Sequence, residues 1–358
     1  MNQIQSPFKF LDAYTKDDKN VFFGRDKEIS QLYQLVLSSP LVLVYGFSGI
    51  GKTSLIRCGL ENKFEPSDWL PLFIRKDDDI IESISEQIQE NSLSAIPNLS
   101  INEEGDEVVF PIIDKLRILY KDHFKPVYLI FDQFEELFIL GKEQERLEFF
   151  RLLKEILESD LQVRMIISMR EEYIARLSTY EDLVPALFEN RMRVEAMSRE
   201  QVKVVIEKSC QEYGIEIEDG DNTLKKMIDN LSESSGLIEL SYLQIYLDRL
   251  YKESVKLGEE RMINEDLLTS VGSLRGILSD FLNQQLTDLE RDLEKKGVKD
   301  KGVPQEILFE LITQDQTKRR MEADVVINRI TNSYAVSKEN IEYCIEELKR
   351  ARIIKEVS

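Results

Sequence analysis

An apolar run that passes abruptly into a glycine-rich turn constrains the fold of this chain more than any other feature. Residues 41–54 read LVLVYGFSGIGKTS, and residues 46–53 match the pattern GxxxxGK(S/T). The pattern stands between a run typical of a buried strand and a helix that we expect to begin near Thr53. Backbone NH groups of such a loop point at phosphate oxygens, and the helix N-terminus adds its positive dipole end. The sequence therefore predicts a phosphate-binding loop.

Side chains of the loop have predicted roles beyond its backbone. We expect Lys52 to reach the β and γ phosphates and the Thr53 hydroxyl to ligate Mg²⁺. A glycine-rich turn with a solvated lysine is the competing interpretation, but a chance match in such a chain is roughly a one-in-a-hundred event. The predicted nucleotide contacts are Gly46, Phe47, Ser48, Gly49, Ile50, Gly51, Lys52, Thr53 and Ser54.

A second apolar run ends in an acidic residue, within VYLIFDQFEELF at residues 127–138. Asp132 stands where a carboxylate must end a strand to hold Mg²⁺, although a lone Asp there can also cap a turn. Gln133 can orient water but is a poor base, whereas Glu135 and Glu136 are acidic candidates for activating it. Spacing leaves open which of the two faces the γ phosphate. The pattern is compatible with ATP turnover, including slow turnover.

Two arginines are candidate cations near the nucleotide. Arg170 ends the run VRMIISMR and would lie beside Asp132 if the two strands are neighbours. A cation there could sense the γ phosphate and distinguish ATP from ADP. An ion pair with Glu171 or Glu172 is the alternative. Arg25, in VFFGRDKEI ahead of the loop, is the second candidate.

Hydrophobic periodicity divides the chain into three sections. In the first, helical patterns alternate with continuous apolar runs, which favours a parallel sheet covered on both faces. After about residue 195 the strand signal disappears. The second section shows amphipathic helices at 199–214, opened by Ser198 as N-cap, and at 236–257. The apolar runs lie at 41–45, 69–75, 127–132 and 163–170.

The third section begins at about residue 272. Its helical patterns are followed by the β-leaning ARIIKEV, and this order suggests a winged-helix unit. The predicted helices span 274–290, 304–314 and 338–351. We thus predict a P-loop nucleotide-binding domain at 1–195, a helical lid at 196–271 and a winged helix at 272–358, in accord with a length of 358 residues.

Composition limits the partners. Asp plus Glu number 67 against 47 Lys plus Arg, giving a net charge of −20, and such a field repels nucleic-acid phosphates. The possible recognition helix SKENIEYCIEELKRA carries four Glu against two Lys and one Arg. DNA binding is therefore disfavoured. The chain has no signal-peptide pattern and no run of 18 apolar residues, and its separated Cys58, Cys210 and Cys344 are typical of reduced thiols. We expect a cytoplasmic protein with no membrane contact.

Four segments in order resemble the STAND class of signal-transduction ATPases, specifically the bacterial novel-STAND group often attached to conflict and defence proteins. They are FFGRDKEI, GFSGIGKTSLIRCGL, LIFDQFEELF and MIISMREEYIARL. The resemblance extends from about residue 7 to 356. It implies an α/β P-loop NTPase domain with a helical lid and a winged helix, in which ADP holds a closed monomer and exchange for ATP permits oligomerisation.

The resemblance also implies site residues. Arg25 would contact the nucleotide, Arg170 would be the sensor arginine, and adenine would lie near Val21, Phe22, Phe23 and Gly24. Two features depart from related switches. Ala196 stands where a lid proline is common, and no histidine follows His123, so no winged-helix histidine can bind the ADP phosphate. Related chains normally continue into a sensor or effector, so we expect that module to be missing from this chain or separate.

Three functions are compatible with these patterns. The first is a nucleotide-gated switch with ATPase activity, serving bacterial stress or antiphage defence. The second is a DNA-handling ATPase related to origin-recognition proteins, which also join a P-loop core to a winged helix. The third is a scaffold that binds nucleotide without turnover.

Overall fold

The computed structural model describes residues 6–9, 12–97, 99–101, 107–232, 238–257, 261–312, 321–350 and 353–354. The chain divides into two compact units, Met1–Leu267 and Leu268–Val357. Each unit has its own hydrophobic core. No helix in the described part of the chain is both long and apolar enough to cross a membrane.

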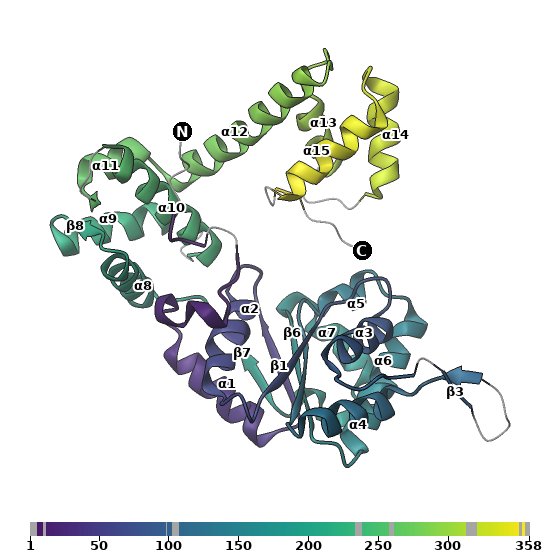
Figure 1. The fold of residues 1–358 in the computed structure, drawn as a ribbon. Coiled ribbons are helices and arrows are strands. Elements are labelled where there is room, and N and C mark those ends of the chain that lie inside the picture. The colour runs from purple at the N-terminus through teal and green to yellow at the C-terminus, as the bar shows by residue number, and fades with distance from the viewer. Residues whose placement is uncertain are drawn as a thin grey trace. The chain divides into compact units, whose positions relative to one another are not determined.

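A five-stranded sheet in the order β2-β5-β6-β1-β7 forms the centre of the first unit (Figure 1). Every pairing in it is parallel. The four predicted strands are confirmed with small changes at their ends. Only β7 was not foreseen, because three residues reading Arg-Met-Arg carry no apolar run. The strands are β1 (Leu41–Gly46), β2 (Leu70–Ile74), β5 (Val127–Phe131), β6 (Val163–Arg170) and β7 (Arg191–Arg193).

Alternation of side chains along the strands supplies both faces of this sheet. In β1, Leu41 and Leu43 join one apolar core, whereas Val42 and Val44 join the other. Helices α3, α4 and α6 cover the first face and α1 covers the second, as Figure 1 shows. The predicted parallel sheet with both faces covered is therefore confirmed. The helices are α1 (Asp26–Ser38), α3 (Ile80–Asn91), α4 (Ile112–His123), α5 (Glu135–Ile139), α6 (Glu143–Glu158) and α7 (Ile174–Leu177).

An antiparallel hairpin between α3 and α4 lies outside the parallel sheet. Its strands are β3 (Leu99–Ile101) and β4 (Glu107–Val109), with Leu99 opposite Val109. Figure 1 shows β3 extending away from the sheet. This hairpin was not predicted, because strands of three residues are too short to form a periodic pattern.

Helices dominate the segment after residue 195. The Ser198 side chain accepts a hydrogen bond from Gln201 N, so the predicted N-cap is confirmed. The predicted loss of strands was wrong in one place, because β8 (Glu216–Ile217) pairs in parallel with β9 (Met262–Ile263). Two residues per strand are too few to form a periodic signal. The helices are α8 (Arg199–Glu212), α9 (Gly220–Ser232), α10 (Leu240–Leu257) and α11 (Glu265–Val271).

The second unit is helical in its described residues. α14 was not predicted because ADVVINRITNS is rich in β-branched residues, yet Val326, Ile327 and Ile330 bury one helical face in the core. Ile353 and Ile354 form a bend, and the rest of ARIIKEV, like residues 313–314, lies outside the described residues. The winged helix therefore remains a prediction. The helices are α12 (Leu274–Lys295), α13 (Val303–Glu310), α14 (Ala323–Ser333) and α15 (Lys338–Arg350).

Candidate nucleotide-binding site

The glycine-rich loop joins β1 to α2 (Lys52–Ser54), and the helix continues as a π-helical segment, Leu55–Leu60. Gly49 and Gly51 have φ of 72° and 92°, the left-handed region that favours glycine. Gly46 is needed for space, since a Cβ there would lie 2.5 Å from Val194 O. The local chain therefore has the strand–loop–helix geometry that the pattern predicts.

Lys52 is held against its own loop. Its Nζ donates to Gly46 O at 2.8 Å and to Phe47 O at 2.9 Å. Burial lowers the pKa of Lys52, and the negative charge of the Glu135 carboxylate offsets part of this change by raising the pKa. A phosphate oxygen is a stronger acceptor for an ammonium group than a carbonyl oxygen. The side chain can therefore exchange these carbonyls for a phosphate.

Thr53 and Asp132 meet at the end of the loop. Thr53 Oγ1 lies 3.1 Å from both carboxylate oxygens of Asp132, and Asp132 is 4% exposed. Hydroxyl and carboxylate oxygens are the donors that Mg²⁺ prefers, so this pair fits the ion. No group of three or more His, Cys, Asp or Glu side chains among the described residues could hold a metal.

Arg170 lies beside Asp132's strand, as the sequence suggests. β6 pairs with β5 on one side and with β1 on the other, where Arg170 stands opposite Gly46. Its side chain pairs with Glu135, with Nε 3.0 Å from Oε1, and its backbone NH donates to Glu135 Oε2 at 3.1 Å. Glu171 binds Arg193 instead. Among the ion pairs of the described residues, none joins Arg170 to Glu171 or Glu172, the alternative partners that the sequence offered.

Glu135 and Glu136 have different surroundings. Both are buried, at 5% and 9% exposed, but Glu135 also contacts the side chain and backbone NH of Arg170 at the end of β6. Gln133 has a φ of 58°, and its carbonyl accepts the Glu136 NH. The sharp turn after Asp132 thus brings Glu135 next to Arg170, which stands opposite Gly46 of the phosphate loop.

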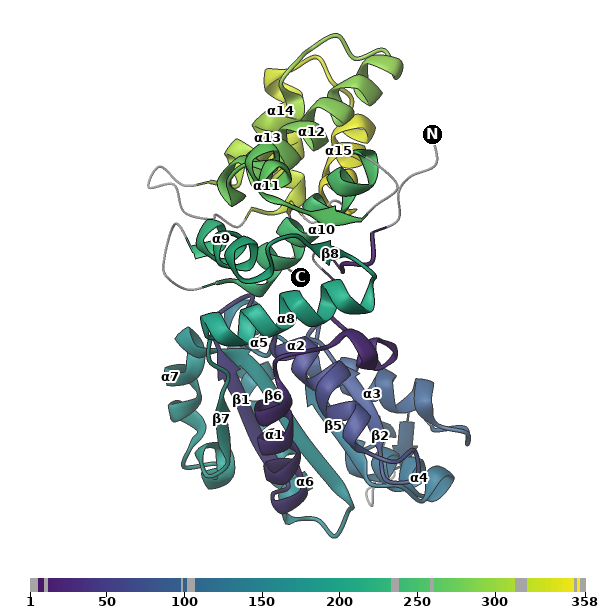
Figure 2. The ribbon, with the colours of Figure 1, turned by 90° about the vertical axis from the view of Figure 1, so that its left-hand side faces the viewer.

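Arg25 contacts the loop backbone. It is 2% exposed, its Nη2 donates to Ile50 O at 3.0 Å, and its Nη1 pairs with Glu28 Oε1 at 2.7 Å. Gln201 of α8 donates to Gly24 O at 3.1 Å. Arg25 therefore links the phosphate loop to the segment that packs on α8, and Figure 2 shows α8 lying across one end of the sheet.

The residues before Gly24 lie among aromatic and polar neighbours. The Phe22 ring lies 5.4 Å from Tyr14, and Lys208 Nζ lies 5.6 Å from the Phe23 ring. Val21 ends the short helical turn that precedes them. Tyr14 N donates to Ser54 Oγ at 3.1 Å, so this N-terminal segment also touches the helix after the loop. Adenine contacts with Val21, Phe22 and Phe23 remain a prediction.

Two arginines near the site were missed in the sequence. Arg75 Nη2 lies 3.1 Å from Asp132 Oδ2, and Arg193 lies over the Phe47 ring at 5.9 Å. Arg75 directly follows the apolar run of β2, as Asp132 follows that of β5, so the same reasoning could have found it. Arg193 belongs to β7 and had no comparable signal.

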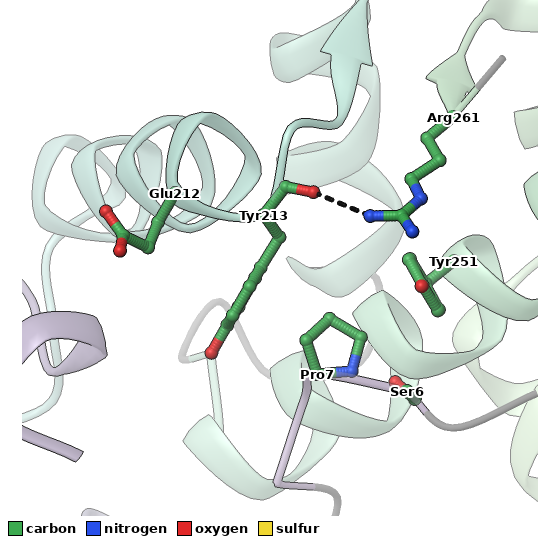
Figure 3. A pocket seen from close by; sticks show the side chains of 6 residues that line it. All are labelled: Ser6, Pro7, Glu212, Tyr213, Tyr251 and Arg261. Atoms are coloured by element: carbon green, nitrogen blue, oxygen red, sulfur yellow. Dashed lines mark hydrogen bonds between the residues drawn. The ribbon is translucent and has the colours of Figure 1, made fainter. Parts of the chain in front are cut away.

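A shallow pocket of about 440 Å³ lies elsewhere in this unit (Figure 3). Figure 3 shows Arg261 donating to Tyr213 O, a bond of 3.2 Å. None of the pocket residues belongs to the predicted nucleotide site, so the contacts around the glycine-rich loop define the candidate site. The pocket is lined by Ser6, Pro7, Glu212, Tyr213, Tyr251 and Arg261.

A parallel sheet with β6 between the loop strand and the Asp132 strand, joined to a glycine-rich phosphate loop, defines the class of P-loop NTPases. Comparison with protein families narrows this class. The family model described as novel STAND NTPase 1 matches residues 7–357. The chain therefore belongs to the novel STAND NTPase 1 family. A search of curated proteins finds no match.

Solved structures agree with this fold. ORC1 of Aeropyrum pernix in complex with DNA has a TM-score of 0.53 at 13% identity, over 93% of this chain and 85% of that one. The Walker-type ATPase paby2304 of Pyrococcus abyssi has a TM-score of 0.50 at 13% identity, over 95% and 92%. ORC2 of Aeropyrum pernix in its ADP form has a TM-score of 0.50 at 15% identity, over 96% and 98%. At such identities the likeness concerns the fold alone.

Proposed function

We propose that this chain is a nucleotide-dependent switch that binds ATP or ADP with Mg²⁺ and hydrolyses ATP. The supporting observation is the hydrogen-bonded connection from the phosphate loop to α8. Ile50 O accepts from Arg25, Arg25 pairs with Glu28, and Gln201 donates to both Gly24 O and Glu28 Oε1. A change in the loop can therefore reach α8 through contiguous contacts.

The residues at the strand ends have separable roles in this proposal. Lys52 binds the β and γ phosphates, while Thr53 and Asp132 hold Mg²⁺, which neutralises phosphate charge when bound. Glu135 orients and deprotonates the attacking water. Arg170 holds Glu135 in position and responds to the γ phosphate. Glu136 is a supporting residue beside them.

Nucleotide state would govern assembly and signalling. We infer that ADP favours a monomer, and that ATP permits self-association and activation of a sensor or effector module, in bacterial stress or antiphage defence. The helical lid at 196–271 and the winged helix at 272–358 belong to this proposal, as does the P-loop domain at 1–195. Family membership and the connection to α8 support it.

The test combines the identity of retained nucleotide with particle mass. We expect the purified chain to carry ADP as a monomer and to gain mass with ATP and Mg²⁺. Lys52→Ala should weaken nucleotide binding about 100-fold, since it removes a charge-assisted contact with phosphate. Asp132→Ala should abolish ATP-driven assembly. A nucleotide-free chain that assembles equally well without ATP would refute the switch.

Handling of DNA is the second candidate, because one similar structure is a complex of ORC1 with DNA. The net charge of −20 and the acidic sequence of α15 argue against it. A gel-shift titration with duplex DNA at near-physiological salt decides between the two. A scaffold without turnover would instead show no phosphate release above that of Glu135→Gln.

A further inference from the structure

Arg75 lies next to the carboxylate that the proposed function assigns to the metal. Sheet register places it there, since β2 pairs in parallel with β5 and Ile74 stands opposite Phe131. The NH of Asp132 donates to Ile74 O at 3.0 Å, which fixes the two strand ends side by side. Arg75 and Asp132, which directly follow β2 and β5, thus form an ion pair in which Nη2 lies 3.1 Å from Oδ2.

The geometry of this ion pair makes it exchangeable. The Arg75 side chain is 45% exposed, whereas that of Asp132 is 4% exposed. The contact joins Nη2 to Oδ2, and it lacks the parallel pair of hydrogen bonds that strengthens many arginine–carboxylate contacts. Water solvates the half-exposed guanidinium well, but the buried Asp132 carboxylate would be left without compensation if the pair simply opened. Arg75 can therefore leave Asp132 when another cation takes its place there.

A divalent cation would compete with Arg75 for Asp132. Thr53 Oγ1 lies 3.1 Å from both Asp132 oxygens, one of which also contacts Arg75. Mg²⁺ binds oxygen ligands at about 2.0–2.1 Å, so an ion held by Thr53 and Asp132 would stand close to the guanidinium. Like charges at such a separation repel strongly in a partly buried site. Metal binding and the Arg75 ion pair therefore oppose each other.

We propose that Arg75 is the internal counter-ion of Asp132 in the metal-free protein and sets the Mg²⁺ concentration at which nucleotide binds. The inference rests on the proposed function, since it requires Thr53 and Asp132 to be the metal ligands. Without metal, the guanidinium neutralises a buried carboxylate that would otherwise repel nucleotide phosphates. When metal and nucleotide enter, Arg75 leaves Asp132 and the metal takes over that neutralisation. Arg75 is thus a positioning residue for charge balance.

The experiment is a Mg²⁺ titration of fluorescent ADP binding to the full chain. Arg75→Gln removes the charge and keeps an amide donor. We expect its Mg²⁺ midpoint to fall about tenfold, because the metal no longer displaces a paired cation. In EDTA its affinity for ADP should fall by about threefold, because the Asp132 charge is then uncompensated. Arg75→Lys, which keeps the charge, should stay near the wild-type midpoint.

Two controls isolate the counter-ion role. Arg117→Gln removes the same charge from an arginine that is 46% exposed and bound to Asp114, so its Mg²⁺ midpoint should match wild type. In an Asp132→Asn background, Arg75→Gln should no longer weaken ADP binding in EDTA, because the carboxylate charge that Arg75 neutralises is gone. Trp69 fluorescence verifies that each variant is folded.

The possible outcomes distinguish a failure of the counter-ion role of Arg75 from a failure of the proposed function. If wild type binds ADP with Mg²⁺ dependence and Arg75→Gln has an unchanged or higher Mg²⁺ midpoint, the counter-ion role is wrong and the proposed function stands. If wild type binds no ADP at any Mg²⁺ concentration, the proposed function itself fails. A lower midpoint for Arg75→Gln, with Arg117→Gln unchanged, supports the counter-ion role.

Discussion

Arginines in two regions near the phosphate loop are held in opposite ways. At the junction with α8, Arg25 is 2% exposed and binds both a loop carbonyl and Glu28. At the strand ends, Arg75 and Arg170 are 45% and 47% exposed, and the side chain of each pairs with one buried carboxylate. Burial therefore distinguishes a fixed connection from exchangeable ion pairs. A switch needs both, since exchangeable pairs can respond to phosphate and a fixed connection can transmit the response.

Arg25→Ala is expected to have the largest effect on stability. Removing a buried arginine that makes both an ion pair and a hydrogen bond typically costs about 3–5 kcal/mol, because its partners lose the guanidinium and its packing is lost as well. Here Glu28 and Ile50 O would both lose the guanidinium. Trp69 is the single tryptophan of the chain and is buried in the first unit, so its fluorescence during denaturant unfolding reports on that unit.

Arg170→Ala is the matched control for Arg25→Ala. Because the Arg170 guanidinium is half-exposed, its loss should cost less than that of Arg25, about 1–3 kcal/mol, most of which comes from leaving the buried Glu135 without its partner. Arg25→Lys should fall between the two, because a lysine cannot reproduce both contacts of the guanidinium. Equal destabilisation by Arg25→Ala and Arg170→Ala would break the distinction between the two regions.

Glu135→Gln tests the exchangeable ion pairs at the strand ends, and its expected effect, on ATP hydrolysis, is the next largest. We expect ATP hydrolysis to fall about 100-fold, since a positioned general base typically contributes at least this much. Glu136→Gln should lower the rate less than about threefold, since the contacts with Arg170 single out Glu135 as the base. Single-turnover phosphate release measures both rates, and ADP affinity should stay unchanged in each variant. A greater loss in Glu136→Gln would transfer the role of base to that residue.

The strand ends were the most predictable part of the site. Apolar runs locate β1, β5 and β6, and parallel strands bring their carboxyl ends to one edge, so Asp132 and Arg170 follow from sequence alone. The pairing of Arg170 with Glu135 did not, because it depends on the left-handed turn at Gln133, a residue that rarely adopts positive φ. Side-chain partners across a turn are set by backbone geometry that periodicity does not encode.

The junction with α8 was hidden for a different reason. Arg25 and Gln201 are far apart in sequence, and polar residues on a helix are usually solvated, so neither pattern indicates that they share Glu28. The second unit illustrates a related limit. Tertiary packing makes α14 helical against its β-branched composition, and such packing is invisible to local propensity.

Ser198→Ala should have the smallest effect on stability, and it tests whether the cap of α8 supports the junction with the segment that carries Gly24. Ser198 caps α8 and exchanges hydrogen bonds with Gln201, whose Nε2 donates to Gly24 O. Loss of a serine cap costs about 1 kcal/mol, and Ser198→Asp should restore most of it because aspartate also caps well. Trp69 fluorescence during unfolding measures the change.

The response of α8 to nucleotide shows whether Ser198 only caps this helix or also belongs to the connection between the phosphate loop and α8. If α8 responds to the loop through Gln201, Ser198→Ala should leave ADP affinity within about twofold of wild type, since coupling energies are small and shared among contacts. The protease sensitivity of α8 should then differ less between the ADP and ATP states than it does in wild type. An unchanged difference would mean that Gln201 holds Gly24 without help from the cap. The connection would then run from Arg25 through Glu28 alone, and the buried arginine would carry the signal as well as the stability.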